Sequence, residues 1–415
     1  MLNLKMHTPQ GVSDYMPYEC SAKRDIEEKM RSAFSSYAYQ EIQTPAIEYN
    51  NIYTDASGDI RQEKLFRFFD SEGRILALRG DITTSIARVI GTKWEDDNFP
   101  ARLMYVSEAF RYNRGEQGMA SEFTQAGIEL IGADGAYADA EAVIVTIKAL
   151  LNAGLDEFQI DIGQVEFFKG LARQIGLSEE DTEKIRELID RKDSLSIEDI
   201  ASKYEGDDEI KNLLCMMPEL FGEADVLERA YTKNLNDRSK KAIENLKDVY
   251  EIIKASGLSK YVSIDLGMLQ SIDYYTGVIF KGVTYDVGFA ICGGGRYDSL
   301  ISGFGKDISA VGMAINVNRV LVAMQRQKKA LKAPEVSALL CIKNNYSDAV
   351  KVADMLRAKG YIIKNCYGSA QDAKKEAKIS GTDCVILVET DSLVKVYQNG
   401  SEKEKSVFEL LNEGI

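Results

Sequence analysis

The sequence predicts an α+β protein followed by a small α/β domain, and three observations support this prediction. Apolar runs of strand length, several in hairpin-like pairs, recur at residues 39–132 and 262–316. A charged stretch with helical spacing, about 178–257, separates them. Strand-like and helix-like segments then alternate through residues 338–388. The pattern predicts a sheet with flanking helices, interrupted by a helical insertion.

Length and composition favour two globular domains. The chain has 415 residues, of which 45% are hydrophobic and 28% charged. Single hydrophobic cores stop growing at about 250–300 residues, so one domain is too few. A Lys-, Ala- and Pro-containing stretch at 327–335 has the composition of a linker. We therefore expect a core at 1–326 and a second domain at 336–415.

The N-terminal segments combine one helix with short strands. Residues 21–36 place Ile26, Met30 and Phe34 on one helical face. Residues 39–49 have strand character interrupted by a proline, and the apolar runs 65–69 and 75–78 flank a polar turn typical of a hairpin. We expect the helix to pack on the sheet that these strands begin.

The central segments continue the pattern. A helix is predicted over 82–90, two strands over 103–112 and 122–132, and an Ala-rich helix over 136–153. After the insertion, strands are predicted at 262–266 and around 278–291, a Gly-rich turn at 293–295, and a strand–helix unit at 309–326. The three glycines lack the G-x-G-x-x-G spacing of a phosphate loop, so a close approach of backbone to ligand is the better interpretation.

Composition also excludes several classes of protein. No apolar run approaches the roughly 20 residues of a membrane helix, and the first residues do not have the pattern of a signal peptide, so we expect a cytoplasmic protein. The six cysteines include no C-x-x-C pair, which favours reduced core residues over disulfides or zinc ligands. One histidine, His7, makes His-ligated metals and Ser-His chemistry improbable. A net charge of −14 argues against a broad nucleic-acid surface.

Residues 110–129 carry the most informative motif, Phe-Arg followed by Phe-x-Gln-x-Gly-x-Glu. This strand–loop–strand resembles motif 2 of the class II aminoacyl-tRNA synthetases, in its histidyl form. Alone it could equally be an amphipathic hairpin with a solvated tip. Four further segments are similar to the same family in the same order, namely 78–88, 269–280, 292–300 and 310–324. Together they extend the resemblance over residues 8–325 and imply an antiparallel class II sheet with flanking helices.

The resemblance also implies a pocket for a free amino acid. Six positions would bind histidine: Asp81, Arg111, Gln125, Glu129, Tyr275 and Tyr297. By family position, Asp81 and Gln125 would meet the ammonium and Arg111 the carboxylate. Glu129 and Tyr275 would hold the imidazole, and Tyr297 would close the pocket. Such groups suit a zwitterion because buried charges need charged or hydrogen-bonding partners. For the two tyrosines, ordinary aromatic packing on a sheet is the competing interpretation.

Three departures from the synthetase pattern fall where ATP would bind. Gln270 stands in place of an arginine that neutralises the α-phosphate, and Met119 in place of a second arginine, although Arg114 remains. The family's Gly-x-Glu-Arg becomes 316–319, Asn-Val-Asn-Arg. Fixed positive charge is usually the largest catalytic contribution, so we expect the activation chemistry to be lost and no catalytic residue or cofactor to remain.

One branch of this family combines such features, the regulatory subunits of ATP phosphoribosyltransferase. The resemblance implies a short-form catalytic subunit as partner, feedback inhibition by free histidine in the first step of histidine biosynthesis, and no tRNA. It also implies a self-dimer through residues 21–49 within a hetero-oligomer, and relates 336–415 to a shortened anticodon-binding domain. A functional or diverged histidyl-tRNA synthetase is the alternative. The sequence leaves open whether histidine would act in the ancestral pocket or at the subunit interface.

Overall fold

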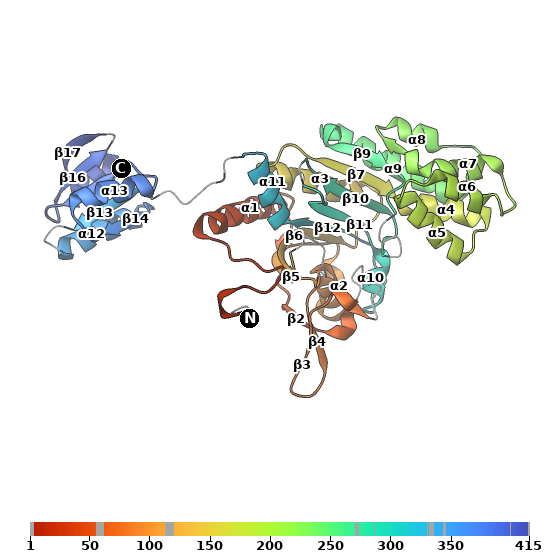
Figure 1. Cartoon of the computed structure of the whole chain (residues 1–415), viewed down its shortest axis with the longest axis horizontal. Helices are drawn as coiled ribbons and strands as arrows, with labels where there is room; N and C mark the ends of the chain where they lie inside the picture. Colours follow the sequence, from red (N-terminus) through yellow and green to blue (C-terminus); the bar gives the residue numbers. More distant parts are fainter. Residues whose placement is uncertain are drawn as a thin grey trace. The chain divides into compact units, whose positions relative to one another are not determined.

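The computed structural model describes residues 4–54, 62–112, 120–269, 274–285, 287–329, 331, 336–342, 346–398 and 400–413. The chain divides into two compact units, Met1–Leu331 and Lys332–Ile415, which are both drawn in Figure 1. Within the described ranges, no helix is long and apolar enough to cross a membrane.

A nine-stranded sheet forms the centre of the first unit. Its strands are β1 (Gln40–Glu41), β5 (Ala101–Phe110), β6 (Glu122–Ile131), β7 (Gln159–Gln164), β8 (Phe221–Gly222), β9 (Val262–Asp265), β10 (Val278–Val283), β11 (Cys292–Arg296) and β12 (Ala310–Asn316). They lie in the order β1-β5-β6-β12-β11-β10-β7-β9-β8. The run from β5 to β7 is antiparallel throughout, whereas β1–β5 and β7–β9 are parallel. The predicted α+β class is confirmed.

Helices cover one face of this sheet. The layer consists of α1 (Pro17–Ser35), α3 (Ala136–Ala153) and α9 (Asp237–Ala255), with α4 (Val165–Ile175) against α9 and α11 (Val317–Arg326) against α1. Helix α1 buries Ile26, Met30 and Phe34, the stripe that its spacing predicts. Helix α3 is buried nearly all round because it packs against α1, α9 and β12. On the opposite face, the helices among the described residues are the short α2 (Thr83–Lys93) and α10 (Asp298–Ser302), near one end.

The predicted Gly-rich turn at 293–295 is wrong. These glycines lie inside β11, where Gly294 pairs with Phe280 of β10 and with Met313 of β12. A Cβ at Gly294 would collide with the carbonyl oxygen of Gly312 and the ring of Phe280. Glycine stands at this position because neighbouring groups occupy the space that a side chain would need. The chain does not reverse direction here.

The helical insertion is confirmed in part. It contains α5 (Glu179–Asp190), α6 (Ser194–Ala201), α7 (Asp208–Met216) and α8 (Asp225–Ala230). Two features of 178–257 were not predicted: β8 pairs with β9 at the sheet edge, and α9 packs on the sheet as part of the helical layer. Strand β7 and helix α4, which precede the insertion, were also missed.

A separate three-stranded sheet projects from this unit at the bottom of Figure 1. Its strands are β2 (Ile47–Tyr49), β4 (Ile75–Leu78) and β3 (Arg67–Phe69), in the order β2-β4-β3. Tyr49, Leu76 and Phe68 stand in register across it and therefore share one face. The described residues of this unit also form six short 3-10 helices: η1 (Leu4–Met6), η2 (Asn50–Tyr53), η3 (Gln62–Lys64), η4 (Asp96–Asn98), η5 (Met217–Glu219) and η6 (Ser259–Tyr261).

The second unit is a five-stranded α/β domain. Its strands are β13 (Ala338–Ile342), β14 (Ile363–Cys366), β15 (Val385–Val388), β16 (Leu393–Gln398) and β17 (Ser401–Ser406), in the order β14-β13-β15-β16-β17. Helices α12 (Tyr346–Ala358) and α14 (Val407–Glu413) pack on one face and α13 (Ala370–Ile379) on the other. The β-α-β-α-β series was predicted. The final hairpin and α14 were not, because their charged residues give no buried-strand pattern.

Candidate functional site

A cavity of about 780 Å³ opens on the sheet face that the main helical layer leaves uncovered. Its floor is formed by β6, β12, β11 and β10, and the residues before α2 form one side. All six residues predicted to bind an amino acid line this one cavity: Asp81, Arg111, Gln125, Glu129, Tyr275 and Tyr297. Glu129 on β6 and Tyr297 just after β11 are 168 residues apart in sequence, and they meet because only β12 separates the two strands.

Glu129 is the most constrained charged group in the cavity. It lies on β6 with 1% of its surface exposed. Thr83 Oγ1 donates a hydrogen bond of 2.6 Å to its Oε1, and the Tyr297 hydroxyl donates to its Oε2. Burial raises the pKa of the Glu129 carboxyl to about 8, because these two hydrogen bonds offset only part of the cost of desolvating its charge. The carboxyl is therefore poised to respond to a cationic or hydrogen-bonding ligand.

Gly312 makes room for this carboxyl. It pairs with Glu129 across β12 and β6, and a Cβ at this position would overlap Oε2 of Glu129. The carbonyl oxygen of Ile128 would also lie only 2.7 Å from that Cβ, so a movement of the glutamate side chain alone would not make room for it. Glycine is the residue that lets a carboxylate lie flat across the neighbouring strand.

Three tyrosines form the wall beside Glu129. The rings of Tyr274 and Tyr297 are stacked with centroids 5.6 Å apart, and Tyr275 meets Tyr274 edge-on at 4.8 Å. Burial raises the pKa of the Tyr297 hydroxyl well above its usual value, so this group remains a neutral donor. Aromatic packing and hydrogen bonding thus both operate at Tyr297, and the two interpretations drawn from the sequence are not exclusive.

Asp81 and Gln125 supply further hydrogen-bond acceptors near Glu129. We call this part of the cavity, with Glu129 and Asp81, the carboxylate end. Asp81 Oδ1 accepts a hydrogen bond of 2.8 Å from the backbone N–H of Thr84 and so orders the start of α2. Gln125 lies on β6, and its Oε1 is buried without a hydrogen-bond donor among the described residues. A buried amide oxygen that lacks a donor costs free energy, which a bound ammonium group would recover.

Two arginines form the opposite end of the cavity. Arg111 follows β5, donates from Nε to the carbonyl of Gly80 at 2.9 Å, and lies over the ring of Phe123. Arg319 on α11 donates to the carbonyl of Ala290 at 2.5 Å and stacks on Phe289 with 4.6 Å to the ring centroid. Burial, followed by the neighbouring charge of Arg111, lowers the pKa of Arg319. This end of the cavity is positively charged.

The departures from the synthetase pattern can be located in part. Asn316 caps α11, since its Oδ1 accepts from the N–H of Arg319 at 3.0 Å. Asn318 accepts from the N–H of Thr124 at 2.8 Å and donates to the hydroxyl of Tyr15. Both side chains line the cavity while holding elements of the fold together. The other positions, Arg114, Met119 and Gln270, lie outside the described residues.

Sequence reasoning overlooked Thr83, Tyr274 and Gly312. Thr83 follows Asp81 by two positions at a helix start, and Gly312 pairs with the predicted Glu129. Neither position reveals from the sequence that it contacts Glu129, because Thr83 reaches Glu129 from α2 and Gly312 reaches it from β12. Where the structure is described, no group of three or more metal-ligating side chains is present. The cavity instead combines the carboxyl groups of Asp81 and Glu129 with the guanidinium groups of Arg111 and Arg319, a set of charges that complements a zwitterion.

Comparison with known proteins decides the family. The profile of the histidyl-tRNA synthetase family matches residues 11–320. The ATP phosphoribosyltransferase regulatory subunit of Acetivibrio thermocellus is 42% identical over 99% of this chain and all of that protein. The protein of the same name from Ruminiclostridium cellulolyticum is 40% identical over the same shares. The chain belongs to the family of ATP phosphoribosyltransferase regulatory subunits.

Solved structures agree with this family. A regulatory subunit/histidyl-tRNA synthetase from Bacillus halodurans C has a TM-score of 0.81 and 29% identity, over 92% of this chain and 97% of that one. Histidyl-tRNA synthetase from Nostoc sp. PCC 7120 also gives 0.81 over 98% of each chain, and its 19% identity shows the fold alone. The predicted resemblance to ATP phosphoribosyltransferase regulatory subunits is therefore confirmed. That the six pocket residues bind histidine stays a prediction.

Proposed function

We propose that this regulatory subunit is non-catalytic, is required by a short-form ATP phosphoribosyltransferase catalytic subunit, and makes that enzyme sensitive to inhibition by histidine. The single observation that carries the proposal is the buried Glu129 between Thr83 and Tyr297 in an otherwise open cavity. A carboxyl held by two hydroxyl groups at a fixed position is suited to an imidazole, which can donate to it from a ring nitrogen.

The rest of the cavity matches the other groups of free histidine. Asp81 and Gln125 offer oxygen atoms to an ammonium, and Arg111 offers a guanidinium to a carboxylate. A site of this kind discriminates strongly because a wrong side chain leaves buried polar groups unpaired. Histidine bound here can inhibit a partner enzyme only to the extent that it binds the inhibited state of the complex more tightly than the active state.

The experiment that tests the proposal is reconstitution. The short catalytic subunit should co-purify with this chain and show full activity only in its presence, and added histidine should inhibit the complex. The matched pair of variants is Glu129→Gln, which removes the ionisable carboxyl, and Glu108→Gln, a glutamate on β5 outside the cavity lining. Only the first should desensitise the complex to histidine. Failure of the two chains to associate would refute the regulatory role.

Persistence of histidine inhibition in the Glu129→Gln complex would refute the pocket while leaving the regulatory role intact. The effector site would then lie elsewhere, with the interface between the subunits as the remaining candidate. The two parts of the proposal therefore fail separately.

A self-dimer is part of this proposal. Tyr49, Leu76 and Phe68 form an apolar row on one face of the projecting three-stranded sheet, and Ile47 and Leu78 extend it. Tyr49 is 50% exposed and Ile47 48% exposed, so this chain leaves the face largely uncovered. Contiguous exposed apolar faces mark interfaces, and twofold self-association is the commonest kind. We propose that a second copy of this chain packs on this face. The face includes β2, which lies at the end of the segment 21–49 predicted to form the dimer.

Light scattering tests the dimer. The full chain should have the mass of a dimer at micromolar concentration, and the double variant Tyr49→Asp/Phe68→Asp should shift it to monomer. Tyr137→Asp is the matched control, since Tyr137 is a 71% exposed aromatic residue on α3. A monomeric wild-type chain would contradict the assignment.

A further inference from the structure

A second, smaller cavity lies between the edge of the main sheet and the helical insertion. Its volume is about 310 Å³, which is within the range of small-ligand sites. Strands β7, β9 and β10 form its floor, while the end of α5, η5 and β8 form the other sides. Five charged residues line it: Asp161, Asp190, Lys192, Asp265 and Lys281. Four of them do not line the first cavity, and Lys281 lines both.

The floor presents both signs of charge from one face of the sheet. Lys281, Asp161 and Ser263 stand in register across β10, β7 and β9, and Asp265 lies two residues further along β9. Ser263 Oγ donates to Asp161 Oδ1 at 2.5 Å, and the N–H of Gly267 donates to Asp265 Oδ1 at 2.9 Å. Both carboxyl groups are thereby fixed in position.

Lys192 brings a positive charge from the insertion. It follows α5 with a φ of +57°, a left-handed conformation that glycine or asparagine adopts more readily than lysine. Its ammonium lies over the ring of Phe221 at 4.7 Å, which holds the side chain on the wall of the cavity. A strained backbone position thus carries a long cationic side chain where a small residue would be less costly.

Four of these charges lie near one another without pairing. Among the described residues, no ion pair of 4.0 Å or less joins Asp161 or Asp265 to Lys192 or Lys281. Burial raises the pKa of Asp265, with Asp161 acting in the same direction and Lys281 and Lys192 opposing it. The four groups therefore interact across the cavity. Space between unpaired opposite charges suits a ligand that carries both charges itself.

We propose that this cavity is a second binding site for a small zwitterion, an α-amino acid or a similar amino carboxylate. Asp161 and Asp265 would accept hydrogen bonds from its ammonium, and Lys192 and Lys281 would donate to its carboxylate. A simple cation would be opposed by the two lysines, and a simple anion by the three aspartates, Asp161, Asp190 and Asp265. The site is separate from the first cavity, although Met268 and Lys281 line both and form the wall between them.

The inference stands apart from the proposed histidine pocket, and its experiment keeps the two distinct. The nineteen L-amino acids other than histidine are the probes, because histidine is the ligand proposed for the first cavity; they are screened at millimolar concentration against the full chain by saturation-transfer NMR. The best binder is then compared with its decarboxylated amine and its deaminated acid. The test variant is Lys192→Asn, because asparagine tolerates the left-handed backbone and the fold should be preserved.

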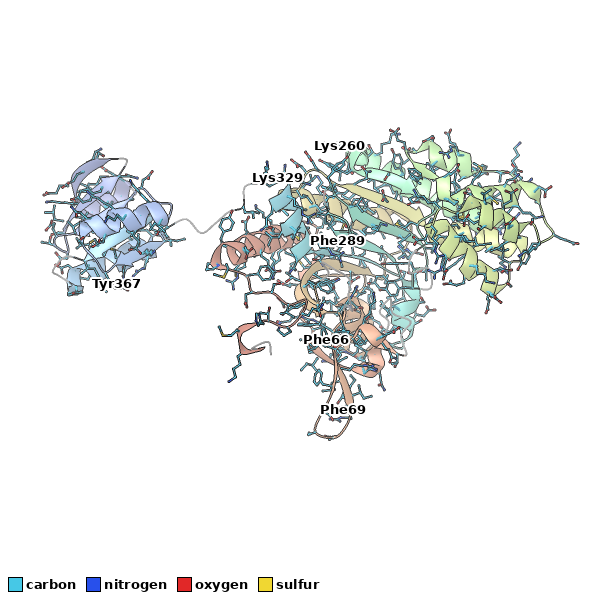
Figure 2. The ribbon with its side chains drawn as sticks, viewed as in Figure 1. Phe66, Phe69, Lys260, Phe289, Lys329 and Tyr367 are labelled. Carbon is cyan, nitrogen blue, oxygen red and sulfur yellow. The ribbon has the colours of Figure 1, made fainter. Side chains whose placement is uncertain are left out.

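Lys260→Asn is the matched control. Lys260, labelled in Figure 2, lies over the ring of Tyr261 at 4.8 Å, the same arrangement as Lys192 on Phe221, but lines neither cavity. The proposal expects the best amino acid to bind the control and Glu129→Ala as it binds wild type. It expects Lys192→Asn to weaken binding at least about tenfold, as for loss of one charge-assisted hydrogen bond.

Each contrary result overturns the proposal. Binding of no amino acid by the wild-type chain would do so, as would equal affinity in folded Lys192→Asn. If the amine or the deaminated acid binds as tightly as the amino acid, only one of the two charges contributes to binding. Loss of the binding in Glu129→Ala, with Lys192→Asn unaffected, would place the amino acid in the first cavity alone.

Discussion

The two ends of the large cavity use their polar side chains in different ways. At the carboxylate end, hydroxyl groups from Thr83 and Tyr297 converge on Glu129, and the acceptor of Gln125 is left without a donor among the described residues. At the arginine end, Arg111 is proposed to bind the carboxylate of the ligand, whereas Arg319 and Asn318 bind the protein itself. Arg319 donates to a backbone carbonyl, and Asn318 joins β6 to the N-terminal segment.

This difference supports the proposal that a pocket of the synthetase type has kept recognition of histidine and lost the activation chemistry. A ligand gains free energy from groups that are positioned but not satisfied, whereas groups already bonded to the fold gain little from it. Asn316 caps a helix and Asn318 bridges two segments, so both positions now contribute to stability. Transition-state stabilisation needs donors aimed at the reacting group, and these side chains are aimed elsewhere.

The largest expected effect is the absence of a reaction. With histidine, ATP and magnesium, the purified chain should exchange no labelled pyrophosphate into ATP above background, because Gln270 and Met119 stand where the synthetases have phosphate-binding arginines. A histidyl-tRNA synthetase assayed in parallel provides the positive control. Robust histidine-dependent exchange would remove the contrast between the two ends and favour the synthetase alternative.

The next effect belongs to the carboxylate end. Gly312→Ala forces a Cβ onto Glu129 and onto the carbonyl of Ile128, and overpacking of this kind costs about 1–3 kcal/mol. Histidine binding should weaken along with stability. Gly288→Ala is the matched control, since nothing lies within 4 Å of a Cβ there. Denaturant melts and calorimetry measure both quantities, and equal behaviour of the two variants would contradict the packing described.

The raised pKa of Glu129 predicts a dependence of stability on pH. The folded state holds the proton up to about pH 8, whereas the ordinary value is 4.5, so the folded state binds more protons between these limits. Stability from this group is thus present at low pH and lost as the pH rises toward 8, by at most about 1.4 kcal/mol per unit. Between pH 5 and 8 the free energy of unfolding of the wild type should fall as the pH rises, and that of Glu129→Gln should fall less steeply. Denaturant melts at several pH values measure both. Parallel curves would contradict the assignment.

How much of this could be predicted from the sequence depended on the range of each interaction. Local spacing predicted α1, α3 and the strands β5 and β6, and the motifs predicted six residues that line one cavity. The glycines of β11 were misinterpreted as a turn, because only the adjacent strands show that a side chain has no space there. The second cavity was also invisible, since its charges come from separate strands and from the insertion.

The smallest effect lies at the arginine end. Asn318→Ala removes two hydrogen bonds within the fold and should cost about 1 kcal/mol of stability. Histidine affinity should change by less than about twofold, because Asn318 is directed at Thr124 and Tyr15 and not at the carboxylate end. Urea unfolding and calorimetry on the same preparation give both numbers. If Asn318→Ala is as stable as wild type but binds histidine poorly, Asn318 contributes to ligand binding and not to the fold, which would contradict the difference described between the two ends.

The most direct measurement is a calorimetric titration of histidine into wild type, Glu129→Ala and the arginine-end control Asn316→Ala. Truncating one partner of a buried charged pair costs on the order of 2–5 kcal/mol, so Glu129→Ala should bind at least about thirtyfold more weakly. Circular dichroism should show all three chains folded, with Asn316→Ala binding as wild type does. If folded Glu129→Ala binds histidine as tightly as wild type, the cavity is not the histidine site and the account is wrong at its centre.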